Sequence, residues 1–467
     1  MKFGGTSVKD DSRMLNVLEI VKEQKEKKIV VLSACGGITD QLIVAANHSK
    51  QKNINEATTI ANQIITHHLE IANKFNNTSI KNDAIQAINK YSAELLNLLE
   101  GIFLLQELTP AAMDSVFAFG ELLSSAVFHF LCLDNKINNQ WFDARNLLKT
   151  DSNFNNANPL AEEYENKLIE IFNNEFNCDL AITQGFIASD LNSRTTTLGR
   201  GGSDLTASLI GSAINAKQIQ IWTDVDGVFT ADPNKIKNAK IIEKMTYSEV
   251  KDLSFWGAKV LHPKTILPAI EKNIPLVVLN SFNPKSTGTT IIAQSQSNEM
   301  KIHSVVAKKN CILQKITINN SETNNSQIVN SSKVVNNSKV NNNDLSLLLN
   351  SNGLLNFSEL LYADYSNGNA DLLFNAASDN VVTAVDSKSA TSKVNNVIVV
   401  CITGENFDLN PILLTETISD IVKCFENVKL HKLICNYSAH SLLFVIDECD
   451  VDVIIEKIHS SQMAATN

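Results

Sequence analysis

The sequence has little of what marks a secreted, membrane-spanning or nucleic-acid-binding protein. Its 8 cysteines are scattered without a C-x-x-C pair, which argues against a zinc site and favours reduced thiols in a cytoplasmic protein. No run of about 18 apolar residues predicts a membrane span, and the first residues lack the apolar stretch of a signal peptide. A formal net charge of -10 argues against a general nucleic-acid surface, because phosphate binding there requires basic patches.

What is present is the composition of an ordinary globular protein. The 467 residues are enough for two or three domains, and 44% hydrophobic with 19% charged residues suits a buried core and a solvated surface. The negative net charge is still compatible with a nucleotide held by backbone N–H groups and a few cations.

Glycines and hydroxyl side chains crowd one central stretch, 194–204, which runs directly into an apolar helical pattern at 205–214. Glycines allow close approach of the backbone to a ligand, and free N–H groups at a helix start bind anions. Asp204 occupies the expected N-cap position, and Arg200 offers a planar fork to a carboxylate or phosphate. The stretch therefore indicates either an anion site or a simple glycine turn capped by an aspartate.

Short apolar strands alternate with helical patterns over about the first 290 residues. A strand at 3–8 and another at 29–33 both end in glycine turns and flank a helix capped by Asp10 or its neighbours. This arrangement is typical of phosphate binding at the carboxyl ends of a parallel sheet. Further strand candidates are 141–143, 179–187, 218–224 and 275–280. The pattern predicts an α/β domain with a mainly parallel sheet.

Residues 41 to about 133 are expected to be mostly helical, with one helix over 83–108, a break at Pro110 and a second helix over 115–133. Within the second helix Glu121 is flanked by phenylalanines and leucines. An acid in such surroundings indicates either a functional carboxylate or merely the solvated face of the helix.

The C-terminal part divides in two. Residues 317–396 are rich in Asn and Ser, which favours loops or weak edge strands. Residues 397–460 predict the order strand, helix, strand, strand, helix, which is most of a ferredoxin-like unit.

Taken together, these motifs resemble those of aspartate kinases, within the amino-acid kinase superfamily. The matching stretches, in family order, are 2–7, 33–34, 37–39, 120–121, 184–187, 194–204, 222–228, 232–233 and 255–263. The layout is most similar to the single-function, lysine-sensitive type.

The resemblance implies a three-layer αβα sandwich with a mainly parallel sheet, followed by ferredoxin-like ACT domains. The implied boundaries are 1–293 for the catalytic domain, 301–396 for a divergent first ACT-like region and 397–467 for a second ACT domain. Pairing through the ACT region implies a homodimer or a larger assembly in the cytoplasm.

The implied reaction transfers the γ-phosphoryl group of ATP, with Mg²⁺, to the side-chain carboxylate of L-aspartate, on the route to lysine, threonine and methionine. An aspartate side chain has an ordinary pKa of about 3.9, so the nucleophile is already ionised at pH 7 and needs no general base. Catalysis then consists of positioning and charge neutralisation. Other amino-acid kinases, acting on glutamate or carbamate, and a catalytically weak regulatory paralogue are the alternatives.

The resemblance also implies roles for individual residues. Lys2 is expected to sit on the transferring phosphoryl group, Asp204 to organise Lys2 and the Mg²⁺–phosphate group, Arg200 to clamp a substrate carboxylate and Glu121 to receive the substrate ammonium. The implied substrate-binding set is Ser33, Thr39, Glu121, Phe186, Arg200 and Ser203. The implied ATP-binding set is Lys2, Gly4, Gly5, Thr6, Ser7, Thr223, Asp224, Phe229 and Lys259. No protein residue is identified as a direct metal ligand.

The sequence departs from the family pattern at three places. Lys2 follows the first Met directly, so the first strand is expected to be clipped or the true start to lie upstream. Phe229 replaces a common Tyr, and Asn234 replaces a common Arg, which removes a cation for the nucleotide phosphates. In 317–396 the residues that would hold a feedback amino acid have no match.

Feedback inhibition is therefore expected to be weak or absent. The purified enzyme should keep nearly all of its aspartate-dependent ATP consumption in low-millimolar lysine or threonine. Clear inhibition by either amino acid would contradict this expectation.

Overall fold

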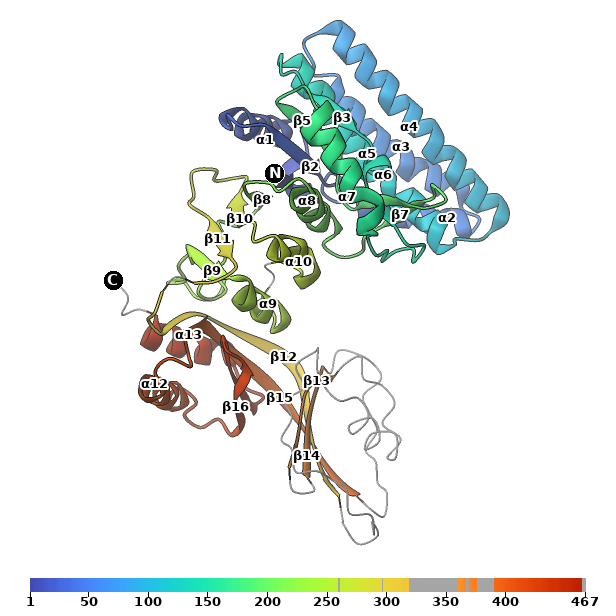
Figure 1. Cartoon of the computed structure of the whole chain (residues 1–467). Helices are drawn as coiled ribbons and strands as arrows, with labels where there is room; N and C mark the ends of the chain where they lie inside the picture. Colours follow the sequence, from blue (N-terminus) through green and yellow to red (C-terminus); the bar gives the residue numbers. More distant parts are fainter. Residues whose placement is uncertain (259–260, 296, 319–359, 367–368, 376–389, 464–467) are drawn as a thin grey trace. The chain divides into compact units, whose positions relative to one another are not determined.

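The computed structural model describes residues 1–258, 261–295, 297–318, 360–366, 369–375 and 390–463 (Figure 1). These residues form two compact units. The first contains 1–228, 241–247 and 261–294, and the second contains 229–240, 248–260 and the residues from 295 onward. Two short segments from within the first 260 residues thus pack with the C-terminal unit.

The first unit is built on an eight-stranded sheet in the order β3-β5-β2-β1-β8-β10-β11-β9. Every neighbouring pair is parallel except β10 with β11. The strands are β1 (Lys2–Phe3), β2 (Lys28–Leu32), β3 (Gln140–Phe142), β5 (Leu180–Gln184), β8 (Ile219–Thr223), β9 (Lys244–Thr246), β10 (Leu276–Asn280) and β11 (Thr289–Ile292). The predicted α/β class with a mainly parallel sheet is confirmed, and β5, buried at all five positions, shows why its pattern is apolar rather than alternating.

Helices cover this sheet, and a small second sheet, β4-β6-β7, lies beside it. The helices are α1 (Asp11–Glu23), α2 (Ile38–Lys50), α3 (Ile54–Ala72), α4 (Thr78–Leu105), α5 (Pro110–Asp134), α6 (Ala144–Leu147), α7 (Ala161–Ile169), α8 (Gly202–Ala213) and α10 (Pro263–Glu271), with the short helical turns η1 (Gly5–Val8) and η2 (Glu170–Glu175). The small sheet contains β4 (Lys149–Thr150), β6 (Ile187–Asp190) and β7 (Thr195–Thr197). Helix α5 packs on β2, β3 and β5, whereas α8 packs on β1, β2 and β8.

Helix α5 begins five residues earlier than the sequence predicts. Pro110 was expected only to end the preceding helix, but it occupies the first turn of α5, and the Thr109 hydroxyl caps that turn by accepting from the Ala112 amide. Proline suits this position because its missing N–H would have no helical partner there. By length and composition the helix could cross a membrane, although no such run was expected from the sequence. However, 78% of its apolar window is buried in the core, so this is weak evidence for a span.

The second unit contains a six-stranded antiparallel sheet in the order β13-β14-β12-β15-β17-β16. Its elements are β12 (Lys301–Ile318), β13 (Leu360–Ser366), β14 (Asn369–Asn375), β15 (Ala390–Glu405), α12 (Pro411–Lys423), β16 (Leu430–Ser438), β17 (Ser441–Asp447) and α13 (Val451–Gln462). The predicted ferredoxin-like order over 397–460 is confirmed. Of the Asn- and Ser-rich region, β13 and β14 are described, while 319–359, 367–368 and 376–389 lie outside the described residues.

Helix α9 (Tyr247–Phe255) ties its segment to the antiparallel sheet of the second unit through buried polar contacts. The His303 Nδ1 atom on β12 lies 2.6 Å from Glu249 Oε1, and the Ser441 hydroxyl on β17 donates to Asp252 Oδ2 at 2.5 Å. These contacts show why residues 248–255 cluster with the second unit.

Two helical glycines in the first unit should respond in opposite ways to replacement by alanine. A Cβ at Gly120 in α5 would lie 2.7 Å from Ala34 Cβ, whereas a Cβ at Gly101 in α4 would meet nothing within 4 Å. Alanine is favoured over glycine in a helix by about 1 kcal/mol, but overpacking costs roughly 1–3 kcal/mol. Gly101→Ala should therefore raise the urea midpoint of the first unit and Gly120→Ala should lower it. Stabilisation by both substitutions would contradict the close packing of α5 on the 34–38 turn.

Candidate active site

A pocket of about 500 Å³ lies at the carboxyl ends of β1, β2 and β5, which are neighbours in the parallel sheet. Of the residues predicted from the sequence, it is lined by Lys2, Gly5, Ser33, Thr39, Glu121, Phe186, Arg200, Ser203 and Asp204. These residues come from segments far apart in the chain, and the ends of parallel strands are where α/β folds bind their ligands.

Lys2 and Asp204 form an ion pair in this pocket. Lys2 Nζ lies 2.7 Å from Asp204 Oδ1, and the two side chains are 12% and 18% exposed. Lys2 is placed by β1 at the centre of the sheet, and Asp204 by the first turn of α8. The Lys2 ammonium therefore lies at the pocket wall. One carboxylate accepts from only part of its three N–H donors, so the others can serve a ligand.

The two glycine turns expected to hold phosphate touch each other. The Gly36 amide donates to the Gly5 carbonyl at 3.0 Å, and the Gly4 amide donates to the Trp222 carbonyl at 3.2 Å. A Cβ at Gly5 would lie 2.7 Å from the Ala34 carbonyl oxygen. Side chains on these turns would therefore separate β1 from the β2 turn, which explains the glycines by close approach.

Two helices begin at the pocket, and one sequence expectation about them is wrong. Gly37 is the N-cap of α2 with φ 86°, and Gly201 is the N-cap of α8 with φ 75°. Asp204 was expected to cap α8, but it is the third residue of the helix, because the left-handed conformation at Gly201 starts the helix earlier. Both helix starts contribute partial positive charge beside the pocket.

Glu121 is a buried acid with one free oxygen. It is 3% exposed, and the Ala34 amide donates to its Oε1 at 3.2 Å. Its Oε2 has no hydrogen-bond partner among the described residues. Burial raises the pKa of Glu121 to about 8, against the smaller opposing effects of the Ala34 amide and of Lys2. The carboxyl is thus poised to ionise when a cation enters the pocket.

Arg200 is exposed and makes no hydrogen bond or ion pair within the part of the chain that the structure describes. It lies between Gly199 and Gly201, both with positive φ. Burial lowers the pKa of the nearby His262 imidazole, and the positive charges of Arg200 and Lys264 lower it further. The guanidinium is therefore available to an anion, and its imidazole neighbour is neutral at pH 7.

The predicted ATP-binding residues are divided between several places. Gly4, Thr6 and Ser7 follow β1, and Thr223 and Asp224 end the adjacent strand β8. Ser281, which the sequence did not single out, joins these two ends, since its hydroxyl lies 2.7 Å from Ser7 Oγ and 3.1 Å from the Thr223 carbonyl oxygen. Phe229 belongs to the second unit, where its carbonyl accepts from the Ser304 hydroxyl at 3.3 Å. Lys259 lies outside the described residues.

Sequence reasoning also missed part of the pocket lining. Cys35, Phe117, Asn155 and Thr197 all line it. Burial raises the pKa of the Cys35 thiol to about 12, which leaves it protonated and unsuited to act as a nucleophile at pH 7. The Phe117 ring packs edge-on to that of Phe186 at 5.9 Å, and its helical spacing of four from Glu121 was the available signal.

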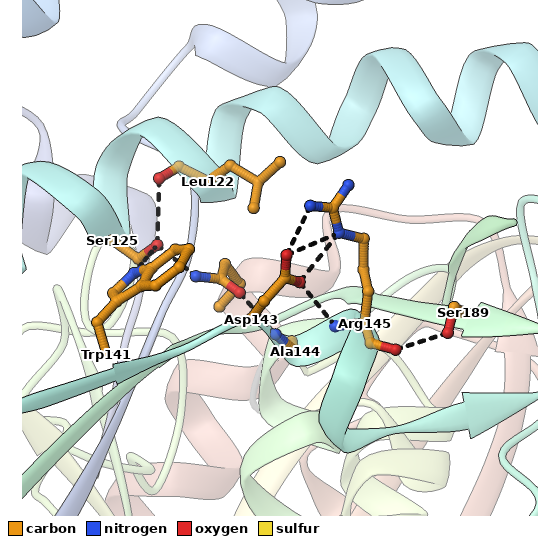
Figure 2. Close-up of polar contacts among 8 residues, drawn as sticks. Leu122, Ser125, Trp141, Asp143, Ala144, Arg145 and Ser189 are labelled. Atoms are coloured by element: carbon orange, nitrogen blue, oxygen red, sulfur yellow. Dashed lines mark hydrogen bonds and ion pairs between the residues drawn. The ribbon is translucent and has the colours of Figure 1, made fainter. Parts of the chain in front are cut away.

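Behind the pocket, a polar network holds α5 against the sheet. The Gln184 amide nitrogen donates to Ser125 Oγ at 2.6 Å, and its carbonyl oxygen accepts from the Ala144 amide at 2.7 Å. Figure 2 shows Ser125 with Trp141 on one side of this network and the Asp143–Arg145 ion pair on the other. Because Gln184 ends β5, the network fixes this strand, two residues before Phe186, to the helix that carries Glu121.

Known proteins with similar sequences include aspartokinases. The chain is 36% identical over 316 residues to lysine-sensitive aspartokinase 3 of Escherichia coli (strain K12), which covers 63% of this chain and 64% of that protein. It is 34% identical over 322 residues to aspartokinase 1, chloroplastic, of Arabidopsis thaliana, covering 68% of this chain and 56% of that protein. The chain thus matches less than two thirds of the length of either relative.

Solved structures match this chain over nearly its whole length. The crystal structure of Escherichia coli aspartokinase III in complex with aspartate and ADP matches with a TM-score of 0.74 and 26% identity, covering 98% of each chain. Clostridium acetobutylicum aspartate kinase has the same fold, with a TM-score of 0.76, 22% identity and 99% coverage of each chain. The resemblance to aspartate kinases expected from the sequence motifs is confirmed by these similarities. Residues 1–280 match the Amino acid kinase family, and the chain belongs to this family.

Proposed function

We propose that the protein is an aspartate kinase, which transfers the γ-phosphoryl group of ATP to the side-chain carboxylate of L-aspartate. One observation carries this proposal: a single pocket holds a buried acid with a free oxygen, Glu121, together with the unpaired cation Arg200 and the Lys2–Asp204 pair. An amino acid with two carboxylates complements these charges. Aspartate and ADP are bound together in the similar Escherichia coli enzyme, which supports the same pair of substrates here.

The substrate would lie with its ammonium at Glu121 Oε2 and its α-carboxylate at Arg200. Burying the substrate ammonium without a counter-anion would cost free energy, so a buried glutamate is needed beside it. Ser33, Thr39, Phe186 and Ser203 line the same pocket and would complete the site. The side-chain carboxylate would then face Lys2, and no base is needed to activate it.

Lys2 would neutralise charge on the transferring phosphoryl group, and Asp204 would hold Lys2 in place. The reaction brings an anion to a polyanion, so electrostatic stabilisation and positioning supply most of the catalysis. The Gly4–Ser7 turn, Gly36 and the ends of β1 and β8 would hold ATP, with Thr223 and Asp224 at its adenosine end. That Phe229 and Lys259 also contact ATP stays a prediction from the sequence resemblance.

Mg²⁺ is proposed to accompany ATP. The described residues contain no cluster of three or more His, Cys, Asp or Glu side chains that could hold an ion alone. Mg²⁺ bound to a nucleotide usually takes only one or two protein carboxylates, and Asp204 in the pocket fits that requirement. The ion would supply charge neutralisation at the phosphates.

We further propose the domain limits 1–293, 301–396 and 397–467, a homodimer or larger assembly through the ACT region, and action in the cytoplasm. The family match over 1–280 supports the first limit, whereas β15 (Ala390–Glu405) runs across the limit at 396/397 within one six-stranded sheet. The side-chain amide of Asn234 donates to Asp232 Oδ1 at 3.2 Å. Because this side chain is neutral, it offers no cation to the nucleotide phosphates.

Removing the Lys2 ammonium tests the catalytic assignment. Lys2→Ala should lower kcat by about a hundredfold or more, as loss of one donor to transition-state charge does in other enzymes. Trapping of the acyl phosphate by hydroxylamine, with aspartate, glutamate and carbamate as acceptors, measures the turnover and the acceptor. Lys22→Ala is the control, because this exposed lysine on α1 pairs with Glu19. An unchanged kcat in Lys2→Ala would remove the assignment.

The pH dependence of aspartate binding tests Glu121. The free carboxyl has a raised pKa of about 8, whereas a bound ammonium would favour the carboxylate, so binding must release a proton below pH 8. The KM for aspartate should therefore rise as pH falls from 8 to 6, by up to about tenfold per unit. Glu121→Gln should raise the KM and flatten this profile while leaving the KM for ATP almost unchanged. A flat wild-type profile would contradict the role.

A further inference from the structure

A second buried acid on α5 lies two helical turns before Glu121. Asp114 and Glu121 are seven residues apart, so they occupy the same side of the helix. Asp114 is fully buried, and it is absent from the pocket lining. It therefore makes no contact with the space that a substrate would fill.

Asp114 binds two segments that do line the pocket. The Asn155 amide donates to Oδ2 at 2.9 Å and to Oδ1 at 3.1 Å. The Thr197 amide donates to Oδ2 at 3.0 Å, and the Thr197 hydroxyl donates to Oδ1 at 2.7 Å. Asn155 and Thr197 are both pocket residues, and the Ala157 amide joins their segments by donating to the Thr197 carbonyl at 2.9 Å.

Both segments need an external anchor. Asn155 has φ 68°, a left-handed conformation that costs energy unless its surroundings hold it. Thr197 ends β7, and the loop that follows reaches Arg200 three residues later through Gly199, whose φ is 73°. Glycine gives this loop little stiffness of its own, so its position depends on where Thr197 is held.

We propose that Asp114 is a positioning residue that sets the span between Glu121 and Arg200, and with it how tightly the pocket holds the ammonium and the α-carboxylate of the substrate. This inference rests on the proposed function for the substrate, but its structural part stands on the contacts alone. One rigid helix carries both the acceptor for the ammonium and the anchor of the loop that carries the carboxylate clamp. A shift of about 1 Å between such groups can change a rate a hundredfold.

A carboxylate suits this anchor best. Three donors converge on its two oxygens, and an ionised carboxylate accepts at all of its lone pairs. An asparagine would keep the volume but leave one oxygen for both backbone amides, and its NH₂ group would force the Thr197 hydroxyl to turn from donor to acceptor. Its neutral hydrogen bonds are weaker than those of a carboxylate, so both segments would be held less firmly.

Asp190 provides a matched control. It ends β6 in the same β6–β7 hairpin, is also fully buried, and accepts from the amides of Asn192 and Arg194 at 3.0 and 2.9 Å. Its carboxylate also accepts from Arg194 Nε at 2.8 Å and from the Ser152 hydroxyl at 3.0 Å, but none of its partners is Asn155 or Thr197. Neither Asp190 nor its partners line the pocket. A general loss of hairpin stability should therefore appear in Asp190→Asn as well, but a loss of positioning should not.

The experiment compares wild type, Asp114→Asn and Asp190→Asn in thermal melting and in steady-state kinetics with aspartate and ATP. Asp114→Asn should raise the KM for aspartate about threefold to tenfold, with the KM for ATP within about twofold of wild type. Asp190→Asn should lower the melting temperature as much as Asp114→Asn does and leave both KM values near wild type. Equal changes in both variants, or an unchanged KM in Asp114→Asn, would overturn the inference.

Amide hydrogen exchange separates this result from a failure of the proposed function. Exchange at 153–157 and 195–200 should rise in Asp114→Asn whether or not aspartate is the substrate, and unchanged protection would overturn the anchor itself. Absence of aspartate-dependent turnover in wild type would instead reject the proposed function. If Asp114→Asn fails to fold, Thr197→Val removes only the hydroxyl contact and should raise the KM for aspartate by about threefold to tenfold; no increase would count against the inference.

Discussion

The contact between Lys2 and Asp204 is the interaction on which the rest of the site depends. A lysine at the centre of a buried parallel sheet would be costly without a partner, and Asp204 at 2.7 Å supplies one. The partner is available only because β1 lies next to β8 and β2 and because α8 begins beside them. The central position of β1 thus places one cation where three neighbouring strands end.

Whereas β1 places a cation in the pocket, helix α5 holds acids away from water. Its apolar character buries it in the core, so any charged side chain on its inner side loses solvation. Burial raises the pKa of Asp114, and three donors offset part of this effect, whereas Glu121 keeps one oxygen free. The difference separates an acid that holds the fold from an acid that is ready for a ligand. Gly120 lets Glu121 reach the Ala34 amide, because α5 meets Ala34 closely at that position.

Much of the secondary structure could be predicted because it depends on local patterns. The capped helix after Asp10, the ferredoxin-like order near the C-terminus and most of the short apolar strands appear where expected. The strand expected over 3–8 is shorter, because β1 ends at Phe3 and a helical turn begins at Gly5. Two helix starts also differ. Asp204 was assigned as a cap because its type suits one, but Gly201 starts α8. The expected break at Pro110 does separate α4 from α5, but α5 begins at Pro110 itself rather than at 115. The left-handed backbone at Gly201 and the extended backbone at Thr109 decided these two starts.

By itself, the sequence determined the alternation of strands and helices, the two glycine turns and the residue types available for an anion site, because these follow from periodicity and from the conformational range of glycine. Only the tertiary structure decided which of these residues meet. No shared motif links Asp114, Asn155 and Thr197, which lie far apart in the chain. Their convergence depends on how α5, β7 and the segment that carries Asn155 pack together. The free oxygen of Glu121 depends on the same packing, because burial is a property of all the surrounding elements and not of one segment.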